Sequence, residues 1–576
     1  DRGKTERSGA DPFNWIRRTG PRSMVGENRR DLEIASGLTR EFVREANGGK
    51  MIGPNSAKVL VKQNCRVGIF LFFVSVLLFL PARAETDIGK TDSEDVKQLV
   101  KRADRHIRRG DYVEAERLLK RAIEIRPDVS AYKLKLAYLY VRNRRLGEAY
   151  DLAFPIARDE PKNARAFAVL GVTMLGAGRF PEARALLINS LKLNRAEALG
   201  WAGLGMVDFY ENNIDQSLEN LQEAVYYEPL EPDYIYALAQ VSARAEKYSE
   251  AAIAYEDFLR ISRNYTDERR ERIKGLIKFL RYLGNKKSLY EAAGAAQTEI
   301  PFLLEGNRPI IEVRVDQQPQ KLRFVLDTGS GISVISDETA RLLKIKPITR
   351  GGFAKGIGGD GRFEIVYGFV REVAIGDVSV RNVPVYIRKF HSDGRIDGYI
   401  GLSLISKFLT TIDYGTQIFS LSRKESGSVA QSPQDGVSVQ LRLTSSGFLS
   451  GEVKIEGFEN PLNFIVDTGA SISVISDAVA AHSALAPFVR DERMRVIGSA
   501  GIAEDVPSFL LPRVTIGSHS RRDVTAIALD LDLINEASGF EQSGILGGNF
   551  LRNYRMTFDF KNSRVTLFPI RPHQAK

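Results

Sequence analysis

Two segments of this 576-residue chain are nearly copies of each other, and each contains the tripeptide Asp-Thr-Gly. The first copy is FVLDTGSGISVISD at residues 324–337, and the second is FIVDTGASISVISD at residues 464–477. In each copy an apolar triplet typical of a strand precedes the aspartate, which is Asp327 or Asp467. If the fold brings these carboxyls together, both cannot ionise, and one keeps a proton near neutral pH. Such a pair can supply an acid and a base to one reaction.

The length and charge of the chain limit the other function classes. A chain of 576 residues exceeds what one hydrophobic core supports, so we expect several domains. The formal net charge is +10, but residues 1–84 hold 15 Lys and Arg against 8 Asp and Glu and so supply most of that excess. The remainder carries only about +3, without a basic stripe, and we expect no nucleic-acid partner.

An apolar run near the beginning of the chain predicts export. Residues 67–80 read VGIFLFFVSVLLFL, follow several basic residues and precede Ala82-Arg83-Ala84. A basic region, a short apolar region and small residues at the end are typical of a secretory signal peptide, predicted here over residues 51–84. The run is short for a bilayer span. We therefore expect a periplasmic or secreted protein. The alternative is that residues 67–80 stay uncleaved and anchor the protein in the membrane, and we expect membrane contact only in that case.

The residues around this signal refine the prediction. Met51 stands at a suitable distance upstream of the apolar run, so residues 1–50 are interpreted as a non-native or disordered extension. The single cysteine, Cys65, precedes the run and would be removed with the signal. A cysteine-free exported chain has neither disulfides nor thiol chemistry.

Residues 96–265 repeat with a period of 34 residues. Proline recurs at Pro127, Pro161 and Pro229, and small residues recur in rows such as these: Ala103, Ala137, Gly171, Gly205 and Ala239. Small residues let paired helices approach closely, and a proline ends each unit because it cannot continue a helix. The segment resembles five tetratricopeptide repeats. The family's glycine at the turn between the two helices is present at Gly110, but Arg144 and Asn212 replace it in the second and fourth repeats.

The repeat resemblance implies a superhelix with a concave groove for a peptide or a protein partner. The alternative is that the array acts as a spacer or a folding support. A charged helix beginning near Thr266 is expected to cover the open end of the array, within a capping helix and linker at residues 266–296.

The rest of the chain has the alternation, glycine content and short apolar runs of strands. A polar linker at residues 424–436 divides it into two all-β units, residues 297–423 and residues 437–571. Glycine-rich hairpin tips occur about 31 residues after each aspartate, and both units close with an apolar-Gly segment, a turn and a final strand. The tips contain these residues: Gly356, Ile357, Gly358 and Gly359 in the first unit, and Gly498, Ser499 and Ala500 in the second.

This order of motif, hairpin and closing glycine resembles the retropepsin-like aspartic peptidases, with the family unit present twice. The predicted fold class is an α-helical tetratricopeptide solenoid followed by two all-β units. The resemblance implies that Asp327 and Asp467 are the catalytic pair of an aspartic endopeptidase. It also implies that Thr328 and Thr468 brace the two loops. A protein or peptide substrate is implied, and no cofactor or metal.

The resemblance assigns further residues to the loops and leaves questions open. Gly329 and Gly469 would allow the tight turns, and the next residues are Ser330 in one copy and Ala470 in the other. Because a hydroxyl at this position tends to favour an acid optimum in the family, the pH optimum stays open. A catalytically inactive peptide-binding protein remains the alternative function. The aspartates could pair within one chain or between two.

Two weaker patterns compete with these and are disfavoured. Residues 356–361 fit G-x-G-x-x-G, but a dinucleotide site needs a helix to follow, and the next residues alternate as strands do. The five histidines are scattered without the spacing of metal ligands.

Overall fold

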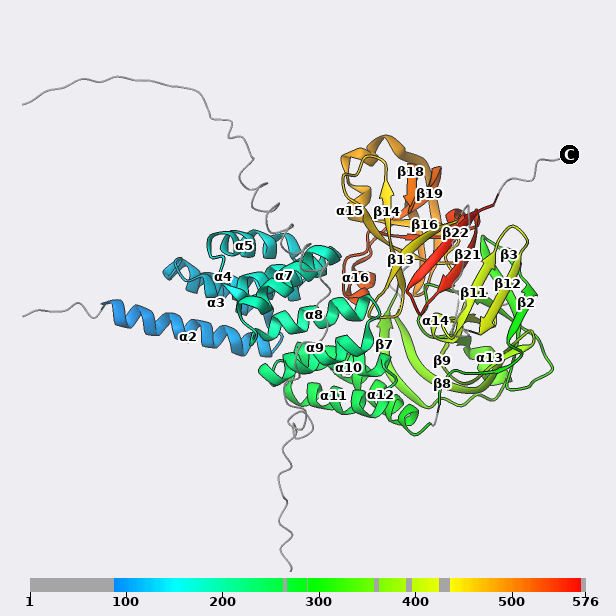
Figure 1. The fold of residues 1–576 in the computed structure, drawn as a ribbon, viewed down its shortest axis with the longest axis horizontal. Helices are drawn as coiled ribbons and strands as arrows, with labels where there is room; N and C mark the ends of the chain where they lie inside the picture. Colours follow the sequence, from blue (N-terminus) through cyan, green and yellow to red (C-terminus); the bar gives the residue numbers. More distant parts are fainter. Residues whose placement is uncertain are drawn as a thin grey trace, which may run out of the picture.

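The computed structural model describes residues 88–262, 267–286, 288–356, 362–389, 396–423 and 436–570. The predicted signal peptide, the extension before it and nearly all of the linker at residues 424–436 lie outside these ranges. Figure 1 shows a helical array followed by β-rich units, which confirms the predicted fold class. Within the described part, no helix has both the length and the apolar character needed to cross a membrane.

The array consists of antiparallel helix pairs stacked side by side. The pairs are α2 (Ile88–Arg108) with α3 (Tyr112–Ile125), α4 (Ser130–Arg142) with α5 (Leu146–Asp159), α6 (Ala164–Gly176) with α7 (Phe180–Leu193), α8 (Ala198–Tyr210) with α9 (Ile214–Tyr227), and α10 (Pro232–Arg244) with α11 (Tyr248–Ile261). Alanine, glycine and leucine fill the contacts, and Gly171 and Gly205 lie where an added Cβ would overlap Leu187 and Leu221 of the partner helix.

The turn inside every pair contains one residue in the left-handed region. The φ angles are 72° at Gly110, 59° at Arg144, 72° at Gly178, 65° at Asn212 and 59° at Glu246. Glycine adopts this conformation without strain, and asparagine tolerates it better than most residues. The left-handed backbone at Arg144 and Glu246 therefore carries a conformational free-energy cost that glycine would avoid.

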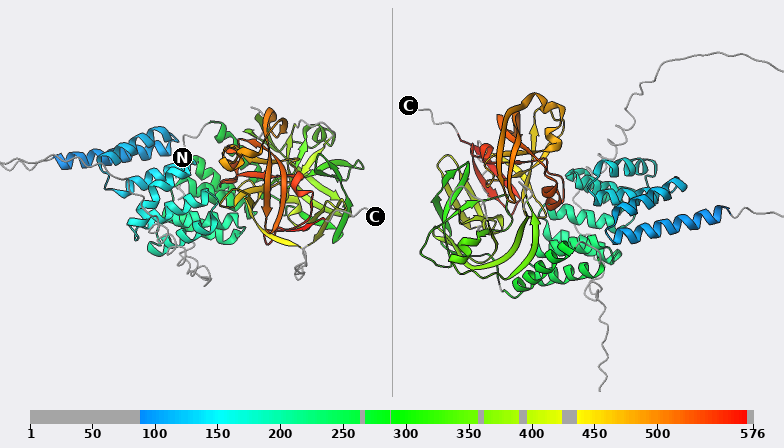
Figure 2. Two further views of the ribbon diagram at one scale, coloured as in Figure 1. Left: turned by 90° about the horizontal axis from the view of Figure 1, so that it is seen from above. Right: turned by 180° about the vertical axis from the view of Figure 1, so that it is seen from behind.

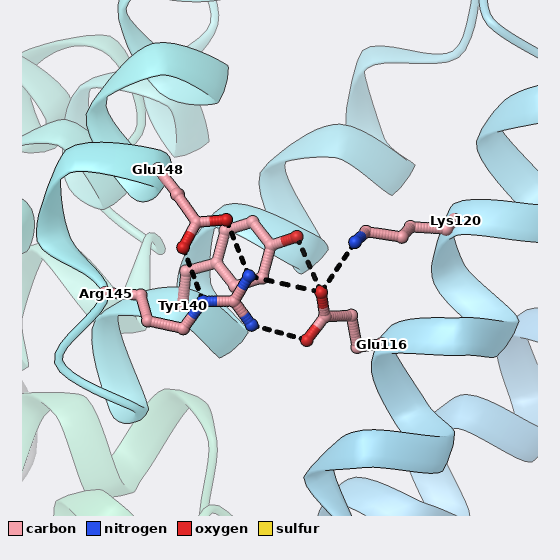
Figure 3. A network of polar contacts seen from close by, with 5 residues as sticks. All are labelled: Glu116, Lys120, Tyr140, Arg145 and Glu148. Atoms are coloured by element: carbon pink, nitrogen blue, oxygen red, sulfur yellow. Dashed lines mark hydrogen bonds and ion pairs between the residues drawn. The ribbon is translucent and has the colours of Figure 1, made fainter.

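A polar network joins the first two repeats (Figure 3). Glu116 of α3 lies 2.7 Å from the Lys120 ammonium and 2.5 Å from the Arg145 guanidinium, and it accepts a hydrogen bond of 3.0 Å from the Tyr140 hydroxyl. Arg145 also pairs with Glu148 at 2.5 Å. Burial of Glu116 opposes its ionisation, but these donors outweigh burial and lower the pKa of Glu116 to about 2.

Helix α12 (Asp267–Gly284) covers the last repeat and also contacts the first β unit. It packs on α11 and on strand β7 (Thr349–Lys355). An added Cβ on Gly275 would lie 2.5 Å from the Arg350 carbonyl oxygen, and the Phe279 and Tyr367 rings stack with centroids 4.4 Å apart. The helix thus joins the array to the β-rich part of the chain.

The first β unit is built on a nine-stranded sheet with the order β1-β9-β6-β10-β5-β4-β8-β7, and β3 pairs with β4. The bounds are β1 (Glu291–Gly294), β3 (Leu303–Glu305), β4 (Arg308–Val315), β5 (Leu322–Leu326), β6 (Val334–Ser336), β8 (Arg362–Ile375), β9 (Val378–Arg388) and β10 (Gly398–Ile400). The short helices are α13 (Asp337–Leu342) and α14 (Leu402–Ile405). Arg362–Ile375 is a strand, as its alternation predicts.

The second unit and the strands that join the two units form a 13-stranded sheet. Its strands are β2 (Gln297–Pro301), β11 (Phe408–Asp413), β12 (Ile418–Arg423), β13 (Val437–Leu443), β14 (Leu449–Ile455), β15 (Leu462–Val466), β16 (Ser473–Ser476), β17 (Val489–Gly498), β18 (Gly501–Ile516), β19 (His519–Leu529), β20 (Gly544–Leu546), β21 (Tyr554–Asp559) and β22 (Arg564–Pro569). The short helices are α15 (Asp477–Ala480), a 3₁₀ turn (Ser483–Phe488), α16 (Asp532–Ser538) and α17 (Gly548–Leu551).

The closing strands of the two units pair with each other inside one chain. β11 of the first unit runs antiparallel to β21 of the second, and Thr411 lies opposite Thr557 with hydroxyl oxygens 3.0 Å apart. β22 and β13 continue this sheet on one side, and β12 and β2 continue it on the other. The sheet fixes the orientation of one unit against the other.

The array docks on the β units through the turns inside its helix pairs. The Arg144 guanidinium donates to the Asn535 carbonyl at 3.1 Å, the Asn212 amide donates to the Phe560 carbonyl at 3.3 Å, and Glu246 lies 2.7 Å from the Lys407 ammonium. These contacts account for polar side chains at turns where glycine would cost less.

An aromatic cluster seals the same interface. The ring of Phe540, which is fully buried in the second unit, lies 4.9 Å from the Phe180 ring and 5.0 Å from the Tyr210 ring of the array, measured between centroids. Both views of Figure 2 agree with Figure 1 that α2 extends away from the β units, whereas the last helices lie against them.

Candidate active site

Each Asp-Thr-Gly loop leaves its strand under the same backbone constraint. β5 runs parallel to β10, and the Asp327 N–H donates to the Ile400 carbonyl at 3.0 Å. In the second unit β15 runs parallel to β20, and the Asp467 N–H donates to the Leu546 carbonyl at 3.1 Å. The closing segments noted in the sequence thus support both aspartates from the same side.

Thr328 and Thr468 connect the two loops. The Thr328 hydroxyl donates to the Val466 carbonyl at 2.7 Å, and the Thr468 hydroxyl donates to the Leu326 carbonyl at 2.7 Å. Each hydroxyl oxygen also accepts the backbone N–H of the opposite threonine, at 3.2 Å for Thr328 N–H and 3.0 Å for Thr468 N–H. Both threonines are completely buried. Four hydrogen bonds therefore set the relative position of the aspartates.

Glycine follows each threonine because the opposite carboxyl occupies the space. A Cβ on Gly469 would lie 2.7 Å from the Asp327 carboxyl carbon, and a Cβ on Gly329 would lie 2.5 Å from Oδ2 of Asp467. Any side chain at either position would push the two carboxyls apart. The glycines therefore permit the close approach as well as the turn.

The two carboxyls have different surroundings. Asp327 accepts the Gly329 N–H at 2.9 Å, whereas Asp467 accepts the Gly469 N–H at 2.7 Å and the Ala470 N–H at 3.2 Å. Burial raises the pKa of Asp327 well above its usual range, and the Asp467 charge and the hydrogen bond between the carboxyls raise it further. Burial raises the pKa of Asp467 as well, but the backbone N–H donors and the hydrogen bond from Asp327 oppose that increase. The geometry favours the shared proton on Asp327 and the charge on Asp467.

Three cleft residues near the aspartates were not found from the sequence. Arg308 favours the ionised form of Asp327 and so lowers the pKa of that carboxyl, opposing burial. Arg388 donates to the Ser499 carbonyl at 2.6 Å, and its guanidinium lies 3.6 Å from the centroid of the Phe363 ring. Tyr399, in strand β10, lines the same cleft. No motif marks these residues, although Arg308 opens an alternating strand and Tyr399 stands inside the closing segment.

The described ends of the glycine-rich hairpins line the same cleft as the aspartates. Gly356 ends the described part of the first hairpin, while Ile357, Gly358 and Gly359 lie outside the described residues. In the second hairpin Gly498 ends β17, and Ser499 and Ala500 form the turn. A Cβ on Gly356 would overlap the Ser499 hydroxyl and lie 3.2 Å from the Ala500 Cβ. Gly356, at the described end of the first hairpin, therefore touches the turn of the second.

The residues that differ between the loop copies occupy different environments. The Ser330 hydroxyl donates to the Ile332 carbonyl at 2.8 Å instead of to Asp327, and Ala470 contributes its N–H to Asp467. Gly331 lies against the Ser446 carbonyl, whereas its counterpart Ser471 accepts a hydrogen bond of 3.0 Å on its carbonyl from the Asn307 amide.

Both aspartates open into one cleft of about 1990 Å³ that the array helps to line. The array contributes residues from α8 to α12, among them Phe209, Arg244, Tyr248 and Phe279. Ligand pockets for small molecules usually measure about 300–1,000 Å³, so this space suits a polymer. The sequence does not predict that the repeats reach the cleft, because the repeat pattern carries no information about docking.

Comparison with known families decides the identity of these parts. A family model for aspartyl proteases matches residues 311–404 and 451–550, and two tetratricopeptide repeat models match residues 106–172 and 202–266. The chain joins tetratricopeptide repeats to two aspartyl protease units. The suspected resemblance is confirmed, and the two Asp-Thr-Gly loops fall one in each aspartyl protease segment.

The other comparisons add little to the aspartyl protease assignment. No curated protein matches the sequence. Among solved structures, a thermophilic TPR protein of Thermus thermophilus is 17% identical, with a TM-score of 0.28 over 32% of this chain and 99% of that protein.

Proposed function

We propose that the chain is an aspartic endopeptidase that hydrolyses unfolded or extended polypeptides with a water activated between Asp327 and Asp467. The observation that carries this proposal is the pair of loops connected by Thr328 and Thr468, which sets two carboxyls with different hydrogen-bond partners side by side in one cleft. The active site is formed within one chain, as the pairing of β11 with β21 supports.

The proposed mechanism follows from the unequal carboxyls. The ionised Asp467 takes a proton from the water while the oxygen of that water attacks the scissile carbonyl carbon. Asp327 gives its proton to the carbonyl oxygen. The resulting gem-diol collapses when Asp467 gives the proton it took to the amide nitrogen, Asp327 takes a proton from one of the hydroxyls, and the C–N bond breaks, which restores the starting protonation of the pair. Two carboxyls that share one proton are the common feature of aspartic proteases, and that class supplies the sequence of steps.

The repeats are proposed to bind part of the substrate. Helices α8 to α12 line the cleft that holds the aspartates, so a polypeptide in the cleft would contact the array directly. This position supports a role in substrate binding over that of a distant spacer. A protein partner in the concave groove of the array is a separate proposal.

Cleavage of an unfolded reporter protein between about pH 4 and pH 8 tests the function. The parent should cut, and Asp327→Asn and Asp467→Asn should each abolish cutting. Asp337→Asn and Asp477→Asn are matched controls, because these aspartates end the same two sequence copies and lie at the start of α13 and α15. If the parent cuts nothing, the endopeptidase proposal fails and the peptide-binding alternative replaces it.

Mixing the two inactive variants tests the intramolecular site. An equal mixture of the Asp327→Asn and Asp467→Asn variants should stay inactive, because the site in every chain then lacks one of its two aspartates. Activity restored on mixing would instead require pairing between chains.

Export to the periplasm or secretion is proposed from residues 51–84, with anchoring by residues 67–80 as the alternative. Cell fractionation with mass spectrometry of the mature N-terminus distinguishes them. A new N-terminus near Glu85 would support cleavage and release, and an intact apolar run in the membrane fraction would support the anchor.

A further inference from the structure

The turn between β13 and β14 is a rigid structure at one edge of the cleft. The Thr444 N–H donates to the Phe448 carbonyl at 2.8 Å, and the Phe448 N–H donates to the Thr444 hydroxyl at 2.8 Å. The Gly447 N–H donates to the Thr444 carbonyl at 2.9 Å, and Thr444 is completely buried. We call residues 443–448 the cleft turn. Its internal hydrogen bonds mean that it moves as one piece.

The inner side of the cleft turn presses on the loop that carries Asp327. A Cβ on Gly331 would overlap the Ser446 carbonyl oxygen and lie 3.3 Å from the Gly447 Cα. From the other side, the Ser403 N–H donates to the Gly331 carbonyl at 3.0 Å. The loop is therefore confined between the cleft turn and α14. This contact accounts for glycine at position 331 where the second copy has Ser471.

The outer side of the cleft turn is bound by the array. Arg244, the last residue of α10, donates to the carbonyls of Leu443, Thr444 and Ser445 at 3.2, 2.6 and 3.2 Å. Its guanidinium lies 4.0 Å from the centroid of the Phe209 ring. Burial lowers the pKa of Arg244 to about 10. In the described residues no carboxylate forms an ion pair with Arg244, so the three carbonyls and the ring are its contacts there.

In the described residues, the turn that presses on the Asp467 loop receives no hydrogen bond from the array. The corresponding turn between β3 and β4 reaches that loop through Asn307, whose amide donates to the Ser471 carbonyl at 3.0 Å. Asn307 in turn accepts a hydrogen bond of 2.9 Å from Arg552 of the second β unit. Among the hydrogen bonds of the described residues, those on this turn come from the β units alone. Of the two turns that press on the aspartate loops, the array is thus hydrogen-bonded, within the described residues, only to the one beside the loop of Asp327.

We propose that Arg244 is a positioning residue through which the repeat array sets the loop of Asp327, by way of the cleft turn and Gly331. The inference rests on the proposed peptidase function for its effect on turnover, but the mechanical connection is independent of that function. Proper docking of the array is then a condition for full activity. A ligand that shifts the last repeats alters the Asp327 carboxyl and leaves the Asp467 loop in place.

Arg244→Met tests the connection, because methionine keeps much of the apolar contact with Phe209 and donates no hydrogen bond. We expect kcat to fall roughly tenfold to a hundredfold, by a larger factor than KM rises, since a small misplacement of a reacting group has effects of this size. Hydrogen exchange should accelerate in residues 328–333 and stay unchanged in residues 468–473. Arg260→Met is the control, because Arg260 is an exposed arginine on the same repeat that pairs with Asp257.

Two more variants cover the case in which Arg244→Met does not fold. Arg244→Lys retains a cationic donor and should recover part of kcat. Gly331→Ala pushes on the same contact from the other side and should accelerate exchange in residues 444–448. Unchanged exchange in residues 328–333 and unchanged kcat would overturn the inference, as would equal acceleration in both loops. A parent that cuts nothing, combined with the one-sided exchange pattern, would overturn the peptidase proposal and leave the connection standing.

Discussion

The hydroxyls of Thr328 and Thr468 each donate to the carbonyl that precedes the opposite aspartate, so neither Asp-Thr-Gly loop is complete without the other. The two bonds are equally long, at 2.7 Å. This reciprocity makes the geometry of the aspartates a property of both units together.

Removing one of these hydroxyls should damage stability and activity together. Thr328→Val leaves a buried carbonyl and a buried N–H without partners, so we expect a loss of about 2–4 kcal/mol in the free energy of unfolding. Thr328→Ser should retain most of both, because the hydroxyl is kept. Thr410→Val is a control, since Thr410 is equally buried but bonds to Ile405 away from the loops. Comparable loss of activity in that control, at matched stability loss, would contradict a special role for Thr328.

Burial of Asp327 should lower the free energy of unfolding at neutral pH. The folded pKa of Asp327 lies well above its ordinary value of 3.8, so its favourable contribution is present below that value and is lost as the pH rises through the folded pKa. Asp327→Asn removes the ionisable group and should raise the free energy of unfolding by about 1 kcal/mol or more at pH 7. The gain should shrink near pH 4. Thermal unfolding at both pH values measures it, and an equal gain at both would contradict the shifted pKa.

Activity should depend on pH through the one proton that the pair shares. Cleavage falls at low pH when Asp467 is protonated, and it falls at high pH when Asp327 loses its proton. Because Arg308 lowers the pKa of Asp327, Arg308→Met should move the alkaline limit of kcat/KM upward. Arg381→Met, which changes an exposed arginine of β9, is the control. A downward shift would show that Arg308 does not act on Asp327 directly.

The Glu116 network should stabilise the first repeats in a pH-dependent way. The folded pKa of about 2 lies below the ordinary value of 4.5, so the contribution is present above pH 4.5 and is lost as the pH falls toward 2. Glu116→Gln should cost about 1 kcal/mol at pH 7, allowing for solvent screening, and nearly nothing at pH 2. Helix melting followed by circular dichroism tests this, with Glu124→Gln, from an exposed pair with Arg121, as the control.

Some parts of the fold follow from local sequence patterns, and others do not. The helical repeats and the β units were predicted because a 34-residue period and the alternation of apolar and polar residues in strands can both be recognised directly in the sequence. The two aspartates were singled out because the same tripeptide occurs in two long copies. The pairing of β11 with β21 could not be predicted, since strand partners distant in sequence leave no periodic signal.

The docking of the array on the β units is the main feature that was not predicted from the sequence. The only related sequence feature was the replacement of the turn glycine by Arg144 and Asn212, which was interpreted as a departure from the repeat pattern. In the structure these residues, with Glu246, contact the β units. Arg244 gave no signal, because an arginine at the end of a helix is ordinary. The contact between Gly331 and Ser446 likewise joins residues that no pattern relates.

The left-handed turns also limit how the array can be redesigned. An engineer who restored glycine at Arg144, Asn212 and Glu246 would relieve the backbone at each site and improve the isolated solenoid. The same edits would delete three of the anchors that seat the solenoid on the β units. A graft of idealised repeats would therefore give a more stable solenoid that fits the β units less well.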